Sequence, residues 1–556
     1  MKLARKDYEF NNTQICQIMP KHIELDRALI NLYMLLKHDG RRPVAKTGRT
    51  PVTVDLLVER LTEQHGDTLR GFRAYPEVVR DWIYSDLVDM VYRGLPDREA
   101  VTAPLPLHLN AYKLRNPKQS LDYRASEHLF SMLREADPDL IRRLADFLGQ
   151  GMSAAGGYEA YDGQTPLDLD TLMIVRMVDT PDLKDGQSGQ GLPLDRPLCI
   201  GQARLMCSDL RRLLAYEAVV PRRVLIDYLR AAFGLHLGLY LLRLFRQVAG
   251  WVQDRAAHPA CLNCPVDPGQ ERPFVACPYA CQNPQAERPS PELLVDMGER
   301  YQCRMAALSR ETCARAYAGI NDYIHAVFTI NQVKRFAESD RGYAYRRSAE
   351  SVAASLALLN RSPEALQNYF SDRLDDLFSA AASTADDEKE RREIQAVYEM
   401  RDLPPLERFI ELVSLERTRY YRKYLTEQVD TVLMKNQETC LLRQGKGRRN
   451  ERRWHIGSQM LEMLVQIAVL EPTGAQEGAK FRSRPILIDD FTAWLGERYG
   501  LVLMPDWPQA TIQDYAAFNA NLGALKRRLR EIGFYTDLSD AYNAQIIRPR
   551  YPIEQG

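Results

Sequence analysis

The stretch RRVLIDYLRAAFGLHLGLYLLRLFRQVAGWV, residues Arg222–Val252, contains the most apolar sequence of the chain. A helix that is hydrophobic on almost every face is buried on every face. We therefore expect Arg222–Val252 to be the central helix of the core, packed against a helix that starts near Arg204 and ends before Pro221. Its most apolar part, Leu235–Val248, is too short and carries too many charges to span a bilayer, so no membrane is expected as a partner. His236 within it is expected to be a core histidine with satisfied hydrogen bonds.

Four cysteines follow this helix, in the pattern Cys261-x2-Cys264-x12-Cys277-x3-Cys281. Two close pairs separated by a longer gap can fold back and present four thiolates to one tetrahedral metal ion. Prolines and a glycine interrupt the surrounding sequence HPACLNCPVDPGQERPFVACPYACQNP, so neither regular structure nor an ordinary hydrophobic core is expected to organise it. We therefore predict that a metal holds the loop 258–291 together, with these four cysteines as its ligands.

Zinc is the metal that this cysteine motif favours, in a structural role, because four thiolates leave no open coordination position. Cys-Pro dipeptides at Cys264 and Cys277 also occur around iron–sulfur clusters, so a cluster stays an alternative cofactor. Four unrelated thiols, packed as small apolar groups, are a further alternative. His258, Cys303 or Cys313 could replace one ligand. The remaining cysteines are expected to be isolated thiols: Cys16, Cys199, Cys207 and Cys440.

The composition is that of a globular protein of several domains. The chain has 556 residues, of which 45% are hydrophobic and 27% are charged. Lys and Arg together number 74, and so do Asp and Glu, so any surface for nucleic acid must be local. The start, MKLARKDYEFNNTQ, lacks the apolar run of a secretory signal, and ten cysteines in so long a chain are not a disulfide framework. We expect a cytoplasmic protein.

Helical periodicity dominates the chain, so we predict a mainly α, multidomain fold built from helical bundles. We expect an N-terminal helical domain over 1–150, followed by a loop or small subdomain over 151–200 that is rich in Gly, Asp and Pro and has one β-like run at Leu172–Val178. A central helical domain with the metal loop is expected over 201–434. A basic linker over 435–456 then leads to a distinct domain over 457–556.

The C-terminal domain is predicted to have three helices followed by a hairpin. Two helices are expected over Gly457–Leu470 and Ile488–Tyr499. The third carries an apolar stripe at spacings of four and three, ends before Gly533, and presents basic residues on its other face. The stripe consists of Phe518, Leu522, Leu525, Leu529 and Ile532. Two short extended runs around a polar turn then predict the terminal hairpin.

This order of elements, together with the sequence GALKRRLREIGFY, resembles a winged helix-turn-helix over about Gly457–Tyr551. In that family the third helix commonly enters the major groove of DNA, and the hairpin touches the backbone. The resemblance implies DNA contacts from the third helix and the wing by Asn521, Lys526, Arg527, Arg528, Arg530, Arg548 and Arg550. Many winged helices bind proteins instead, and a basic helix face is often only solvated, so both readings stay open.

The linker before this domain is strongly basic and contains two glycines. A flexible basic arm beside a winged helix could grip phosphates, since each neutralised phosphate releases counterions. An ordinary solvated linker is the alternative. The predicted contacts of the arm are Lys446, Arg448, Arg449, Arg452 and Arg453.

No catalytic motif is evident: the sequence lacks H-E-x-x-H, G-x-S-x-G, the dinucleotide glycine fingerprint and the kinase set. The acids Asp168 and Asp170 could belong to a nuclease, but the Glu-x-Lys expected nearby is missing. The sequence therefore favours a binding protein over an enzyme.

The chain also resembles, in overall character, accessory subunits of bacterial anti-phage defence systems, including methylation-associated ones. The resemblance lies in its size, the zinc loop, the terminal winged helix and the sequence VVPRRVLIDYLRAAFGLHLGLYLLRLF before the cysteines. It implies a non-catalytic, DNA-binding or scaffolding component with partners such as a methyltransferase, an ATPase or a nuclease. A transcription regulator that binds one operator and an unrecognised nuclease are the alternatives.

Overall fold

The computed structural model describes residues 5–43, 52–95, 99–155, 158–183, 185, 188–270, 272–274, 277–279, 293–384, 388–445, 451–473, 480–505, 510–535 and 545–553. The fold is mainly α and multidomain, as predicted. Short two-stranded pairs are the only sheets within these residues.

The core is built on α7 (Ile200–Leu214) and α8 (Arg222–Gln253), which Pro221 separates. α8 is buried on nearly every face and packs against α7, α10 (Arg304–Glu338) and α14 (Pro405–Val432), so the prediction of a central buried helix is confirmed. Gly238 lets the end of α14 approach α8, because a Cβ there would lie 2.2 Å from Leu433 Cδ2. By length and composition α8 is the one described helix that could cross a membrane, but most of it is buried inside the protein, as core helices are.

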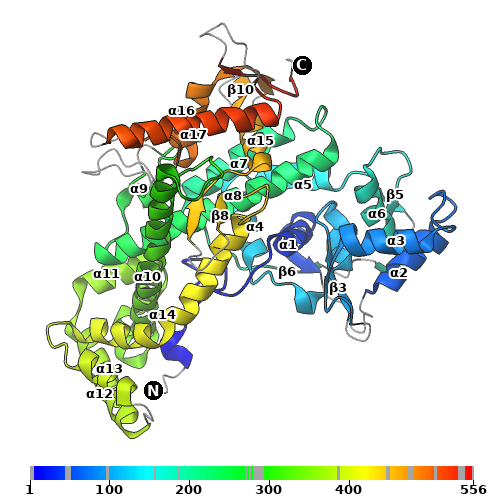
Figure 1. Cartoon of the computed structure of the whole chain (residues 1–556). Helices are drawn as coiled ribbons and strands as arrows, with labels where there is room; N and C mark the ends of the chain where they lie inside the picture. The colour runs from blue at the N-terminus through cyan, green and yellow to red at the C-terminus, as the bar shows by residue number, and fades with distance from the viewer. Residues whose placement is uncertain are drawn as a thin grey trace.

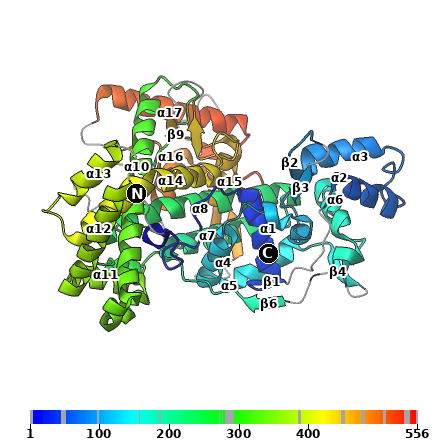
Figure 2. The same cartoon turned by 90° about the horizontal axis from the view of Figure 1, so that it is seen from below.

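Among the elements of the first 150 residues, α2, α3 and β3 lie in a lobe that projects to one side of the molecule, whereas α4 contacts α7 of the core (Figures 1 and 2). α1 packs against α4 and α5, as expected for helices joined in one small bundle. The elements are η1 (Arg5–Tyr8), α1 (Leu25–Lys37), β1 (Arg41–Pro43), α2 (Val54–Glu59), η2 (Arg60–Gln64), α3 (Pro76–Trp82), η3 (Ile83–Leu87), β2 (Val88–Val91), β3 (Ala100–Pro104), η4 (Leu109–Leu114), η5 (Pro117–Gln119), α4 (Ala125–Ala136) and α5 (Pro138–Leu148).

The segment 151–200 contains a hairpin, one helix and a strand that pairs with β1. The elements are β4 (Met152–Ala155), β5 (Tyr158–Tyr161), α6 (Leu169–Val178), η6 (Pro181–Leu183) and β6 (Ser188–Gly191). The β-like run predicted at Leu172–Val178 is wrong, because these residues lie in α6. Asp168 starts this helix: its carboxylate accepts hydrogen bonds from the backbone N–H and the hydroxyl of Thr171, at 3.0 and 2.8 Å.

A second helical group lies on the side of the molecule opposite the projecting lobe (Figures 1 and 2). Long α10 runs from the C-terminal domain into this group, where it contacts η7 and α14. The elements after α8 are α9 (Pro259–Leu262), β7 (Leu293–Leu294), α10, η7 (Asp340–Ala349), α11 (Val352–Arg361), α12 (Glu364–Thr384), α13 (Glu388–Tyr398) and α14.

The segment 435–456 differs from the flexible basic linker that the sequence predicted. Its described residues form an antiparallel pair, β8 (Leu442–Gln444) and β9 (Arg452–Trp454), packed into the core. Leu441, Leu442, Trp454 and Ile456 are all fully buried. These apolar residues outweigh the basic ones in deciding the structure, because burying them removes a large apolar area from water.

The C-terminal part has the three predicted helices. The apolar stripe of the third helix faces the interior, because Phe518, Leu525 and Leu529 are buried. Gly533 follows the third helix with φ of +79°, the left-handed conformation that its position predicted. The elements are α15 (Ser458–Ala468), β10 (Leu470–Thr473), β11 (Lys480–Ser483), β12 (Ile486–Leu487), α16 (Ile488–Tyr499), β13 (Leu501–Val502), α17 (Ile512–Glu531) and β14 (Ile546–Ile547). Residues 536–544, at the centre of the predicted terminal hairpin, lie outside the described residues.

Candidate functional site

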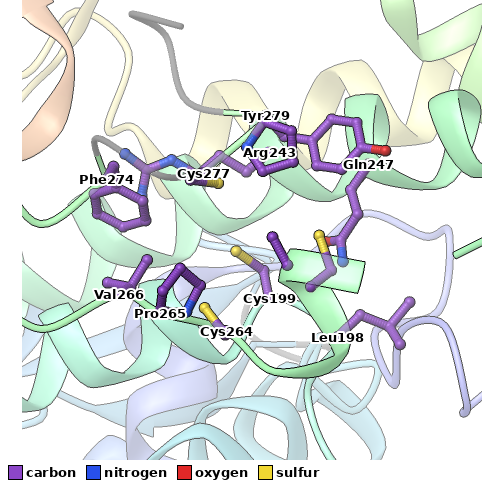
Figure 3. A pocket seen from close by; sticks show the side chains of 14 residues that line it. Leu198, Cys199, Arg243, Gln247, Cys264, Pro265, Val266, Phe274, Cys277 and Tyr279 are labelled. Atoms are coloured by element: carbon purple, nitrogen blue, oxygen red, sulfur yellow. The ribbon is translucent and has the colours of Figure 1, made fainter. Parts of the chain in front are cut away.

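Four cysteines line one small cavity between the N-terminus of α7, α8 and the loop after α9: Cys199, Cys261, Cys264 and Cys277. Figure 3 shows the sulfur atoms of Cys199, Cys264 and Cys277 directed toward the same space. The cavity volume is about 20 Å³, enough for a particle of the size of one water molecule. Three of the four predicted ligands therefore share one cavity, whereas Cys281 lies outside the described residues.

Cys199 is the residue that sequence reasoning missed at this cavity. It was expected to be an isolated thiol, but it precedes α7 and lines the cavity with the cysteines of the loop. Cys199 lies 62 residues before Cys261, so no local spacing connects it with the motif. The packing of α7 against α8 brings it there, and a sequence pattern does not report such packing.

The thiols of this cavity are not drawn together as a preformed ligand set. Within the described ranges, no group of three or more His, Cys, Asp or Glu side chains is placed to hold a metal ion. Burial raises the pKa of Cys199 and of Cys261 to about 12, and it also raises the pKa of Cys277. As placed, these side chains are neutral thiols at neutral pH, and a bound cation would favour their thiolate forms.

Arg243 supplies a buried positive charge to the same cavity. Its side chain comes from α8, lines the cavity and is only 3% exposed, with its guanidinium 3.6 Å from the centre of the Phe274 ring. Its Nε and Nη1 have no hydrogen-bond partner among the described residues. An N–H group that is unpaired in the interior lowers the stability of the fold, so an anionic group in the cavity would stabilise this guanidinium.

The loop around the cysteines is also held by arginines from three helices. Arg204 of α7 donates to the carbonyl oxygens of Cys264 and Val266, at 3.0 and 3.1 Å. Arg246 of α8 donates to Tyr279 O at 2.9 Å, and Arg498 of α16 donates to Pro268 O at 3.1 Å. Val266 and Phe274 are buried beside them. The expectation that no ordinary hydrophobic core organises the loop is therefore wrong in part, because Val266 and Phe274 belong to the main core, and arginines of the core helices bind the carbonyl groups of the loop.

The basic face predicted on α17 is retained in part. Arg527, Arg530 and Arg548 are exposed, on the last turns of α17 and directly after β14. Neither Arg527 nor Arg548 has a carboxylate partner within the described part of the chain. Lys526 donates to the side-chain oxygen of Gln545 at 2.8 Å. These side chains place positive charge at one end of the C-terminal domain.

Two further arginines of the predicted set make contacts within the protein. Arg528 forms ion pairs with Glu531 at 3.1 Å and Glu299 at 3.4 Å. Arg550 pairs with Glu462, donates to Ile532 O, and lies over the Phe534 ring. Their charge is neutralised locally, which lowers their attraction for a polyanion.

Two residues of the predicted DNA-binding set, Asn521 and Arg453, are interior residues, which is a correction, and Arg452 is partly buried in an ion pair. Asn521 is buried and bridges strand backbones: it donates to Val295 O and Leu503 O and accepts from Met297 N. Arg453 is fully buried in an ion pair with Asp296, and Arg452 makes two 2.8 Å bonds to Asp430. A side chain whose donors are consumed inside the fold is not available to DNA. Lys446, Arg448 and Arg449 lie outside the described residues.

The acids singled out for a nuclease do not form a pair. Asp168 caps α6, as described above, and Asp170 lies 3.9 Å from Arg223. A different charged cluster joins α1, η4 and β5 in the N-terminal lobe: Lys113 lies 3.2 Å from Glu159 and 3.6 Å from Asp185, and Lys37 contacts the same two acids. Two lysines balance two carboxylates here, so the cluster has the character of a structural ion-pair network.

The whole chain belongs to one protein family. The family model described as "Methylation-associated defense system protein MAD7" matches residues 5–551, and the chain is a member of that family. Neither the curated proteins nor the solved structures contain a match to the chain. The predicted resemblance to a methylation-associated defence component is therefore confirmed at the level of the family.

Proposed function

We propose that this member of a methylation-associated defence system is a non-catalytic, DNA-engaging scaffold component that acts in the cytoplasm with other proteins of the system. The observation that carries the DNA contact is the exposure of Arg527, Arg530 and Arg548 at one end of the C-terminal domain. Cationic side chains that are exposed to solvent attract the phosphates of DNA.

The strand pairing of the C-terminal domain supports its interpretation as a winged helix. β12 precedes α16 and pairs with β14, which follows α17. The backbone N–H of Arg548, next to β14, donates to Phe534 O at 3.2 Å, so the chain on either side of the turn region lies side by side. A wing requires a strand that follows the three helices and pairs with an earlier strand, as β14 does with β12.

Binding of duplex DNA as a function of salt tests this proposal. We expect wild-type affinity to fall steeply with salt, and the variant Arg527→Gln/Arg530→Gln/Arg548→Gln to bind more weakly with a log–log salt slope reduced by up to about 3, one per lost phosphate contact. The control carries three exposed arginines changed elsewhere, Arg70→Gln/Arg142→Gln/Arg401→Gln, and should bind as the wild type does.

Three outcomes would contradict the proposal or replace it. Equal binding by the variant and the wild type would show that the basic residues of α17 and next to β14 do not contact DNA. A strong preference for one duplex sequence would favour the transcription regulator, since phosphate contacts alone carry no sequence information. Metal-dependent cleavage of the probe would favour the nuclease.

We further propose that the thiol cavity binds a structural zinc ion. The support is the spacing of Cys261, Cys264 and Cys277, their shared cavity, and the unpaired guanidinium of Arg243 beside it. A zinc ion with four thiolates carries a net charge of about −2, so a buried arginine that donates to the sulfurs would offset it. An iron–sulfur cluster is the alternative occupant, and its visible absorption would identify it.

Two cysteines compete for the fourth position of this site. Cys281 completes the sequence motif, and Cys199 completes the cavity. Substitution of each by serine, followed by the absorption spectrum of the cobalt-loaded protein, separates them, because the thiolate-to-cobalt charge-transfer band weakens when a true ligand is lost. Cys303→Ser is the matched control, since Cys303 caps α10 and serine is a good cap.

A further inference from the structure

A concave surface between the N-terminal segment and α14 combines tyrosine rings with positive charge. We define this tyrosine groove by the residues Arg5, Tyr8, Lys21, Arg417, Tyr420 and Tyr421, which line a cavity of about 340 Å³. Figure 1 shows the N-terminal segment lying against α14 at the end of the molecule away from α17. A cavity of this volume is large enough for one nucleotide-sized group.

Two cations of the groove, Arg417 and Lys21, lie close to its aromatic rings. The guanidinium of Arg417 lies 3.8 Å from the centre of the Tyr8 ring. Lys21 Nζ lies 5.2 Å from the ring centres of both Tyr420 and Tyr424, and it donates to the hydroxyl of Tyr420. The planar guanidinium of Arg417 and the tyrosine rings are both surfaces on which a flat, electron-rich ring can stack.

The floor of the groove is rigid, whereas its rim is open to solvent. Tyr421 is buried, stacks on Phe10 with ring centres 4.5 Å apart, and donates to Tyr8 O at 2.9 Å. Tyr420 beside it is 40% exposed. An exposed ring on a fixed support is a stacking platform that costs little conformational entropy when a ligand binds.

The positive charge of the groove itself comes from Arg5, Lys21 and Arg417, which line it. The exposed Arg419, Arg422 and Lys423 lie on the opposite face of α14, because a helix turns by about 100° per residue. The acids close to the groove are Glu9 on its wall, Glu416 in an ion pair with Arg417, and Glu427 near His22. Cations outnumber acids around the opening, which favours an anionic ligand.

From these contacts we infer that the tyrosine groove is a binding site for single-stranded nucleic acid, separate from the duplex surface on α17. Unpaired bases stack on the Tyr8 and Tyr420 rings, and the phosphates lie against Arg5 and Lys21, which line the groove. A duplex fits poorly, since its bases are already stacked on one another and cannot reach the rings. The site would let the chain engage a strand that another component of the system has exposed.

Fluorescence anisotropy with a labelled oligothymidine and with a duplex of equal length tests this inference. We expect Tyr420→Ala to weaken binding of the single strand by about tenfold or more, the effect of losing one stacked base, and to leave duplex binding unchanged. The α17 variant Arg527→Gln/Arg530→Gln/Arg548→Gln should do the reverse, so failure of the duplex site and failure of the groove are distinguishable.

A second variant changes the charge of the groove and keeps its rings. Arg5→Gln/Lys21→Gln removes two of the cations that line the groove, and it should reduce the salt slope of single-strand binding by about 1.4 for two phosphates. The control Tyr75→Ala/Arg70→Gln removes an exposed tyrosine and an exposed arginine on the projecting lobe and should change neither affinity. No binding of the single strand by the wild type, or equal binding by wild type and both groove variants, would overturn the inference.

Discussion

Single buried residues carry most of the unusual chemistry of this molecule. His128 is 1% exposed, its two ring nitrogens have no hydrogen-bond partner among the described residues, and its ring lies edge-on to Tyr240. Burial lowers the pKa of His128 to about 3, well below its ordinary value near 6.5. The unfolded chain therefore binds a proton at this residue at a pH where the folded chain does not.

The pH dependence of stability follows from this depressed pKa. The contribution of His128 to stability is fully present above about pH 6.5 and is lost as the pH falls toward 3. We expect His128→Leu to flatten the fall of the apparent unfolding free energy between pH 6 and 4 by about 1.4 kcal/mol per pH unit. Urea titrations of both proteins across that range measure it, and an unchanged slope would contradict the account of His128.

Residue patterns predicted the lining of the thiol cavity only in part, for a physical reason. The spacing of Cys261, Cys264 and Cys277 is a local property of one loop, and the sequence reports it directly. Cys199 and Arg243 reach the same cavity through the packing of α7 and α8, which no short pattern encodes. Asn521 and Arg453 show the opposite error: both are polar in sequence but have their hydrogen bonds inside the fold.

At the scale of elements, a buried polar network joins α7, α8 and α16. Asp209 of α7 accepts from Arg498 and from the Tyr499 hydroxyl at 2.6 Å, and it lies 3.1 Å from His236 of α8, which also contacts Gln202. Burial opposes ionisation of Asp209, but Arg498 and His236 hold the pKa of its carboxyl well below the usual range. The network therefore attaches the C-terminal domain to the core through a charged aspartate.

Removal of one partner from this network should be costly. We expect Asp209→Leu to destabilise the protein by about 3–5 kcal/mol, because Arg498 is left buried without its counter-ion. The double variant Asp209→Leu/Arg498→Met should recover part of that loss. Asp139→Asn, which breaks an exposed pair with Arg142, is the control and should change stability by less than about 1 kcal/mol. Equal effects of Asp209→Leu and Asp139→Asn in urea titration would contradict the role of the network.

Elements with strong apolar periodicity were predicted well, and elements with mixed signals were not. α8 and α17 carry long apolar faces, which tertiary packing reinforces. The run Leu172–Val178 is short and rich in residues that suit either a helix or a strand, and the cap at Asp168 decides for the helix. The charge of segment 435–456 predicts a solvated linker, but its buried Leu442 and Trp454 decide its structure. The sequence around Tyr420, ERTRYYRKYL, contains the signal for the tyrosine groove, namely tyrosines interleaved with cations.

At the scale of the whole molecule, the proposed scaffold role depends on how charge is distributed over the surface. The net charge is zero, so attraction for nucleic acid depends on local surfaces, and the two proposed here lie at separate ends of the molecule. The loop that carries Cys264 and Cys277 contacts α7, α8 and α16, because Arg204, Arg246 and Arg498 donate hydrogen bonds to its carbonyl oxygens. A metal in this loop would fix the relation between the core and the C-terminal domain.

Metal content of freshly purified protein, measured by elemental analysis, tests the central claim most directly. The account predicts about one zinc ion per chain in the wild type and in Cys303→Ser, and loss of that zinc in Cys264→Ser. Wild-type protein with neither zinc nor iron at stoichiometric levels would contradict it.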